Sequence, residues 1–366
     1  MKNKSLITVI CFALVLCVFS VMCFIKPEGE FSESERRPLE KMPELSLESV
    51  LDGKFMAGFE KYATDQVPFR EYLKSIKANF VLKVLNKKDN NGIFIHDGYV
   101  SKLDGEINEE MADNAAEKFL YIYESYLKGK DMNIYLSLIP DKNLYLESMG
   151  YPALDFDELS RIMQEKCPYM TYIDIAKLLE LDSYYKTDSH WRMEKIVPVA
   201  KLLLEKMGAN SNAEYETLTL DVPFYGVYAM QSSLRVEPDE IKYLTNSSLE
   251  NCTVTYFDAG EGKKGDMYNM DKAYGKDPYE MFLSGSTPLC VIENPEGDKE
   301  KELFLFRDSF GSSIAPLLCE GYGKITLIDT RYIQSSHLGS FVEFNEGSDV
   351  LFLYSTMLLN NSMALR

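Results

Sequence analysis

The chain has 366 residues, of which 46% are hydrophobic and 12% aromatic, a composition typical of a globular protein with one large core or two modest ones. Its formal net charge of −18 argues against a nucleic-acid partner, because phosphate backbones are bound by basic surfaces. The net charge leaves room for a local basic groove.

The first 26 residues predict a membrane anchor. Lys2 and Lys4 precede an uncharged apolar stretch from Leu6 to Ile25, which is long enough to cross a bilayer as a helix. Positive charge at its N-terminal end predicts that residues 27–366 lie outside the cytoplasm. An uncleaved anchor is favoured over a signal peptide, because the apolar stretch is long and lacks an A-x-A-like cleavage site.

Residues 27–90 are predicted to form a juxtamembrane tether followed by a helical segment. Pro27 to Pro43 is rich in Glu, Ser and Pro, as linkers often are. Helical spacing of apolar residues then predicts one helix over 69–84 and a second over 111–126 that stops at Gly129. The first helix carries Phe69, Leu73, Ile76, Phe80 and Val84 on one face.

From residue 132 the pattern alternates between apolar runs and helical segments. Runs that are apolar on both faces are typical of strands in a parallel sheet covered by helices on each side, so residues 91–366 predict an α/β domain. Asn210 to Asp277 is interpreted as an inserted loop region or small lobe. The predicted strands are Asn133–Ile139, Tyr172–Ile175, Leu289–Ile292, Glu302–Phe306, Lys324–Ile328 and Val350–Tyr354, with helices at Ile196–Met207 and Ser312–Cys319.

Two short segments, Thr187–Trp191 and Arg307–Gly311, hold the three groups of a serine hydrolase. A serine hydroxyl becomes a good nucleophile when an imidazole takes its proton and a carboxylate orients that imidazole. Ser309 follows a buried strand and opens a helix, whose N-terminal N–H groups are candidates to bind a developing oxyanion. The alternative is that Ser309 is an ordinary helix N-cap.

Asp188 and His190 carry the same ambiguity, because Asp188 precedes a helix and fits an N-cap as well. The chain has only three histidines, and of these only His190 lies two residues from a carboxylate, that of Asp188. No second His or Cys stands near it, so no metal site is expected. The four cysteines after the anchor are scattered and lack C-x-x-C spacing.

Asp188-Ser189-His190-Trp191 and Asp308-Ser309-Phe310-Gly311 resemble the DHHW family, membrane-anchored bacterial proteins similar to the SGNH-hydrolase-like alginate O-acetylation proteins AlgJ and AlgX. Further blocks resemble the family in the same order, so the likeness covers nearly all of the chain after the anchor. It implies a flavodoxin-like SGNH fold with a permuted motif order. These blocks are 33–39, 65–70, 91–100, 140–142, 279–285 and 329–332.

The resemblance implies Ser309 as nucleophile, His190 as base and Asp188 as its orienting acid, with Arg331, Tyr332, Lys142 and Trp191 at the substrate site. Arg307 stands where many SGNH sequences have Gly, and Asn143 and Asn360 are the candidates for the oxyanion asparagine.

The implied function is transfer or removal of an acyl group, with acetyl expected, on a cell-surface polysaccharide, without a cofactor and with a membrane-bound acyl-exporting partner. The alternative is a catalytically silent glycan-binding or envelope-assembly protein. The abundant Tyr fits sugar stacking and a protein core equally.

Overall fold

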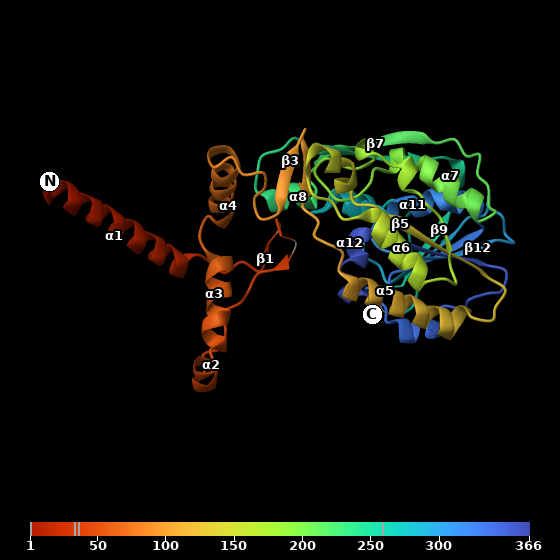
Figure 1. Cartoon of the computed structure of the whole chain (residues 1–366), viewed down its shortest axis with the longest axis horizontal. Helices are drawn as coiled ribbons and strands as arrows, with labels where there is room; N and C mark the ends of the chain where they lie inside the picture. The colour runs from red at the N-terminus through yellow and green to blue at the C-terminus, as the bar shows by residue number, and fades with distance from the viewer. Residues whose placement is uncertain (1, 33, 36, 258–259) are drawn as a thin grey trace. The chain divides into compact units, whose positions relative to one another are not determined.

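In a computed structural model, which describes residues 2–32, 34–35, 37–257 and 260–366, the apolar N-terminal stretch forms one long helix, α1 (Lys2–Ile25). Its Ser5–Cys23 part is long and apolar enough to cross a membrane, and none of it is buried. These properties fit the predicted anchor and fit a signal sequence equally. Helix α1 is the red helix that begins at the N-terminus in Figure 1.

Helix α1 belongs to the first of two units, which comprises Met1–Phe94 and Val227–Val236. The predicted helix over 69–84 is present as α4 (Arg70–Asn79) continued by one π-helical turn, η1 (Phe80–Val84). The other elements of this unit are β1 (Phe31–Ser32), β2 (Arg37–Pro38), α2 (Leu47–Leu51), α3 (Lys54–Gln66) and α8 (Val227–Ser232).

The predicted tether is held by specific contacts with the end of α3. Strands β1 and β2 pair antiparallel, and Arg37 donates to both carboxylate oxygens of Asp65 at 2.6 and 2.7 Å. These bonds hold the pKa of Asp65 at about 2. Gln66 exchanges two hydrogen bonds with the backbone of Gly29, both 2.9 Å long. The segment is therefore folded against α3; Glu33 and Arg36 of the predicted tether lie outside the described residues.

The second unit, Ile95–Gly226 with Glu237–Arg366, is built on an eight-stranded sheet of order β10-β9-β11-β13-β12-β14-β5-β6. Five neighbouring strands of this sheet, β13, β12, β14, β5 and β6, are parallel, which confirms the α/β prediction. The bounds are β5 (Asn133–Ile139), β6 (Thr171–Tyr172), β9 (Thr253–Phe257), β10 (Lys263–Gly265), β11 (Leu289–Glu293), β12 (Glu302–Arg307), β13 (Lys324–Ile328) and β14 (Asp349–Ser355).

The sheet is mixed, because β11, β9 and β10 run antiparallel to their neighbours. The run at Leu289–Ile292 was expected in a parallel sheet, and that orientation is wrong for this strand. A strand buried on both faces has the same apolar composition in either direction, so the run does not encode its orientation. Strands β9 and β10 come from the segment predicted as an insertion, of which residues 258 and 259 lie outside the described residues.

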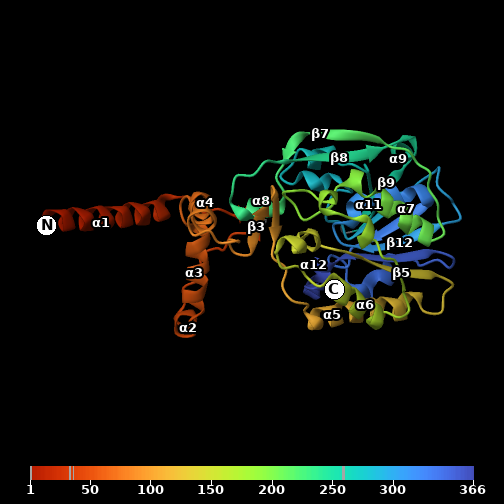
Figure 2. The ribbon, with the colours of Figure 1, turned by 45° about the horizontal axis from the view of Figure 1, so that its top comes forward.

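Helices cover both faces of the sheet, as the alternation of side chains along each strand requires. In β12, Leu303 and Leu305 join a hydrophobic cluster with α7 (Val197–Lys206) and α11 (Gly311–Leu318), whereas Phe304 and Phe306 join one with α5 (Glu109–Ile122) and α6 (Phe156–Lys166). Figure 2 shows these two helix layers on opposite sides of β12 and β5.

The remaining elements are short and lie mostly in the loops around the sheet. Strands β7 (Glu216–Phe224) and β8 (Asp239–Thr245) pair as a separate antiparallel ribbon. The others are β3 (Ile93–His96), β4 (Tyr99–Lys102), α9 (Ser247–Asn251), α10 (Met270–Ala273), α12 (Thr356–Leu359), a π-helical turn after α5 (Tyr123–Leu127) and 3-10 turns at Lys142–Met149, Ala176–Leu178, Leu181–Ser183, Met193–Lys195, Pro278–Met281, Cys319–Gly321, Ser335–Ser340 and Ser362–Ala364.

The carboxyl ends of the parallel strands form the edge at which the two segments of interest meet. Strand β12 ends at Arg307, directly before Ser309, and the loop with Asp188 and His190 follows β6. Ligands of open α/β sheets bind at this edge.

Candidate active site

Ser309, His190 and Asp188 lie in one hydrogen-bonded row. The Oγ of Ser309 is 2.8 Å from Nε2 of His190, and Nδ1 of the same ring is 2.5 Å from Oδ1 of Asp188. Asp188 is buried, and the His190 side chain keeps 12% of its surface exposed. The fold thus brings together two segments that are 119 positions apart in the chain.

The Asp188 carboxylate holds the backbone as well as the ring of His190. Its Oδ1 also accepts the backbone N–H of His190 at 3.0 Å, which closes a tight turn over 188–190. The next α-helix begins only at Val197. Asp188 is therefore not a helix cap, which removes the alternative interpretation of this residue.

Ser309 is presented by a turn that Asp308 anchors. Oδ1 of Asp308 accepts the N–H of Phe310 at 3.0 Å, and Oδ2 accepts the N–H of Ser355, at the end of β14, at 2.8 Å. The N-cap of α11 is Phe310, whose own side chain makes no capping hydrogen bond. The Ser309 hydroxyl is not a helix cap and instead lies against His190.

The N–H groups directly after Ser309 already have partners inside the turn. Besides the bond from Phe310, the N–H of Gly311 donates to the Asp308 carbonyl at 3.1 Å and that of Ser312 to the Ser309 carbonyl at 3.2 Å. The expectation that these N–H groups are unpaired is wrong, and binding of an oxyanion at this helix end stays a prediction. Asn143 and Asn360 are likewise bonded elsewhere, to Ser101 and Lys102 and to Asn108 and Glu106 respectively.

Lys142 is hydrogen-bonded to the loop that carries Asp188. It was predicted to contact substrate, and it contacts this loop instead. Its side chain is fully buried, and Nζ donates to the carbonyls of Tyr185, Lys186 and Asp188 at 3.0, 3.2 and 2.7 Å. Burial lowers the pKa of Lys142 to about 8. An ammonium group has the three donors that this loop requires.

The same loop is fixed on its other side by Asp239 and Gly226. Asp239 accepts the N–H groups of Lys186 and Thr187 and the Thr187 hydroxyl, at 2.9, 2.7 and 2.6 Å. A Cβ atom on Gly226 would lie 2.2 to 2.6 Å from Asp188, so only glycine allows the backbone to pass this close.

Trp191 joins the two segments of the site and, like Lys142, is fully buried instead of facing substrate. Its indole N–H is 3.1 Å from the Phe310 carbonyl and 2.9 Å from Oγ of Ser313. The ring also packs edge-on against Phe310, with centroids 5.4 Å apart. Trp191 therefore ties the His190 segment to the start of α11.

Tyr279 supports the imidazole of His190, a role that the sequence interpretation did not assign. The two rings are stacked, with centroids 3.9 Å apart and 14° between their planes. The Tyr279 hydroxyl lies 3.0 Å from Oγ of Ser313, and burial raises the pKa of this phenol, which keeps it neutral. No sequence spacing indicates such a stack, because the partners are 89 positions apart.

Arg331 and Tyr332 make contacts outside the hydrogen-bonded row. Arg331 donates twice to the buried Asp329, at 2.9 and 2.7 Å, and Nη1 of Arg307 is 3.5 Å from the same carboxylate. Tyr332 lines a cavity of about 400 Å³ together with Phe341 and other residues, none of them from the row. The role of Arg331 and Tyr332 in substrate binding stays a prediction.

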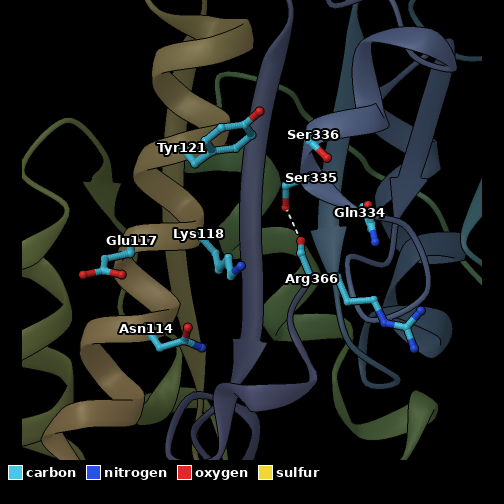
Figure 3. Close-up of a pocket in the computed structure, with 8 residues that line it drawn as sticks. All are labelled: Asn114, Glu117, Lys118, Tyr121, Gln334, Ser335, Ser336 and Arg366. Carbon is cyan, nitrogen blue, oxygen red and sulfur yellow. Dashed lines mark hydrogen bonds between the residues drawn. The ribbon is translucent and has the colours of Figure 1, made fainter.

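A second cavity, of about 630 Å³, also excludes Ser309 and its partners. Figure 3 shows residues of α5 on one side of it and Gln334, Ser335 and Ser336 on the other, next to Arg366. Among the residues that the structure describes, no group of three His, Cys, Asp or Glu side chains is placed to hold a metal ion.

Ser309, His190 and Asp188 thus place a hydroxyl, an imidazole and a carboxylate in hydrogen-bonding order on an α/β fold, and solved structures share this fold. No family model and no curated protein matches the sequence. A DHHW family protein from Eubacterium siraeum superposes with a TM-score of 0.62 at 21% identity, over 75% of this chain and 95% of that chain.

Two further solved structures are similar. Bacillus cereus PatB1 with a sulfonyl adduct has a TM-score of 0.57 and 18% identity, over 73% of this chain and 95% of that one. The O-acetyltransferase domain of Pseudomonas putida AlgJ has a TM-score of 0.45 and 12% identity, over 74% and 93%. The DHHW family protein and PatB1 confirm the fold relationship that the sequence motifs predicted.

Proposed function

We propose that this chain is an extracytoplasmic acyltransferase or esterase, anchored by α1, that acts on a cell-surface polysaccharide through Ser309, His190 and Asp188. The observation that carries the proposal is the row of two hydrogen bonds from Ser309 Oγ to His190 and from His190 to Asp188. The Asp188 carboxylate accepts a hydrogen bond from the protonated Nδ1 of His190. Nε2 is then the nitrogen that accepts the proton of the Ser309 hydroxyl.

The reaction runs in two steps. In the first, Ser309 Oγ attacks the acyl carbonyl carbon and its proton passes to Nε2 of His190, which then protonates the leaving alkoxide, so that an acyl ester on Ser309 and a free alcohol result. In the second, a sugar hydroxyl or water attacks that ester, its proton passes through Nε2, and Ser309 regains its hydroxyl. A sugar acceptor makes the protein a transferase and water makes it an esterase.

The substrate class follows from the sequence resemblance and not from the site geometry. The resemblance to AlgJ and AlgX favours acetyl as the acyl group and a membrane-bound partner that exports it. The sulfonyl adduct of PatB1 adds support, because sulfonyl reagents react with activated nucleophiles. The apolar helix α1 fits a protein that works at the outer surface of the membrane.

A fluorophosphonate probe on the full chain tests the proposal. We expect covalent labelling that disappears in Ser309→Ala, because only an activated serine reacts rapidly with such a probe. Ser189→Ala is the matched control, since Ser189 is also buried and adjoins His190 but lies outside the row. Labelling that survives in Ser309→Ala contradicts the proposal, and a folded chain that takes no label favours the silent glycan-binding alternative.

Tyr279 provides a prediction about how the imidazole is held. Tyr279→Leu removes the stacked ring, and we expect the labelling rate of Ser309 to fall on the order of 10²-fold, because small misplacements of reacting groups cost this much. Tyr279→Phe keeps the ring and should label within a few fold of the wild type. Equal rates in both variants would show that the stack does not position His190.

A further inference from the structure

Helix α4 and its continuation η1 expose the face that a helix normally buries. Five apolar residues at helical spacing are 42 to 66% exposed: Phe69, Leu73, Ile76, Phe80 and Val84. Tyr72, at 74%, adjoins them. A surface helix ordinarily turns such a stripe toward a core. Here the stripe, defined by these six residues, faces solvent along the whole of α4 and η1.

The opposite face of the same helix makes the contacts with the rest of its unit. Ala78 is fully buried, and the side chains of Arg70 and Lys74 are only 16 and 25% exposed because both reach Glu35. Arg70 Nη2 lies 2.7 Å from the Glu35 carboxylate and Lys74 Nζ lies 3.2 Å from it. The helix is thus held in place by its polar side, and the apolar stripe cannot simply rotate inward without breaking these ion pairs.

The segment is also basic in an acidic protein. Residues 70–88 contain six Lys and Arg against the single acidic Glu71, a net charge of +5, whereas the whole chain has −18. Lys77, Lys83, Lys87 and Lys88 are exposed. A helix that combines an exposed apolar face with exposed lysines is typical of one that lies in the headgroup region of an anionic bilayer.

We propose that α4 and η1 lie on the membrane surface, with the stripe inserted at the boundary of the acyl chains and the lysines on anionic headgroups. The inference rests on the proposed anchoring by α1, which belongs to the same unit. The charge argues for lipid as the occupant, because this segment carries +5 and is attracted to an anionic surface that repels the acidic chain on average. The unit then has two membrane contacts, one spanning and one interfacial.

The test uses the full chain in vesicles of equal parts phosphatidylglycerol and phosphatidylcholine with brominated acyl chains. A Phe80→Trp variant adds an indole on the stripe, and the natural Trp191 supplies a constant background because it is buried in the other unit. We expect brominated lipid to quench at least half of the added emission and aqueous iodide to leave it nearly unchanged. Flotation of the same vesicles first confirms that the chain is anchored.

Phe341→Trp is the matched control, since Phe341 is an exposed phenylalanine of the other unit. Iodide, and not brominated lipid, should quench the emission of the indole at this position. Replacement of Lys77, Lys83, Lys87 and Lys88 by Gln should lower the lipid quenching severalfold, and so should vesicles without phosphatidylglycerol. Iodide quenching of Phe80→Trp overturns the proposal, as does protection from both quenchers, which would mean that protein covers the stripe. Labelling of Ser309 is read separately, so failure here leaves the proposed chemistry untouched.

Discussion

An Asp188→Asn variant is expected to lose about 10⁴-fold in the rate at which Ser309 is labelled or acylated, the size of effect that loss of the orienting carboxylate has in serine hydrolases. The amide cannot stabilise the imidazolium, and it favours the tautomer in which Nε2 carries the proton. The fold should persist, because Asn has nearly the same size and shape as Asp. The measurement is the labelling rate constant at fixed probe concentration.

Asp97→Asn is the matched control for this substitution. Asp97 also adjoins a histidine, with Oδ2 at 3.6 Å from Nε2 of His96, but it is largely exposed and lies outside the row. We expect no change in rate for this variant. A decrease of less than tenfold in Asp188→Asn would show that Asp188 does not orient His190 during the reaction.

A Lys142→Met variant is expected to label at least 10²-fold more slowly, because Lys142 holds the loop of Asp188 through backbone carbonyls. Methionine fills a similar volume but leaves the carbonyls of Tyr185, Lys186 and Asp188 without the ammonium. The loop then shifts, and Asp188 moves with it. Lys186→Met, an exposed position of the same loop with the same change of charge, should label like the wild type.

Lys142→Met should also lower the free energy of unfolding. The three lost charge-assisted bonds cost about 1.5 to 3 kcal/mol each, which together exceeds the roughly 3 kcal/mol that removing the buried charge returns. Between pH 8 and about 10.4 the unfolded chain binds a proton that folded Lys142 has released, so this group makes the wild type more stable as pH rises. In denaturant unfolding across this range, the wild type should gain stability relative to Lys142→Met as pH rises, because the other titrating groups are common to both chains.

Much of the fold is predictable from local patterns, because buried parallel strands are continuous apolar runs. The run at Asn133–Ile139 is β5 with the same bounds, and Lys324–Ile328 is β13. Strand direction is not encoded in such a run, which explains the error at β11. The contacts that fold the predicted tether against α3 could not be predicted from the sequence either. They depend on hydrogen bonds of Asp65 and Gln66 to residues 25 or more positions away.

The residues of the site also divide into those that local sequence predicts and those that depend on tertiary packing. Ser309, His190 and Asp188 stand in short motifs, so local sequence predicts them, and the structure brings them into hydrogen-bonding distance. Lys142 and Trp191 were predicted at the substrate site, but charge and aromatic character do not reveal whether a side chain faces a ligand or a buried carbonyl. Tyr279 was missed as a support of His190 because ring stacking depends on tertiary packing alone.

The position of β14 in the sheet has a consequence for how the protein matures. This strand follows every other strand in the chain, yet it lies between β12 and β5, and its Ser355 N–H secures Asp308. Until β14 arrives, the two halves of the sheet have no shared partner and both present unpaired edges, which invite aggregation. The sheet can therefore be completed only after residue 355 has been synthesised, because no earlier strand joins its two halves.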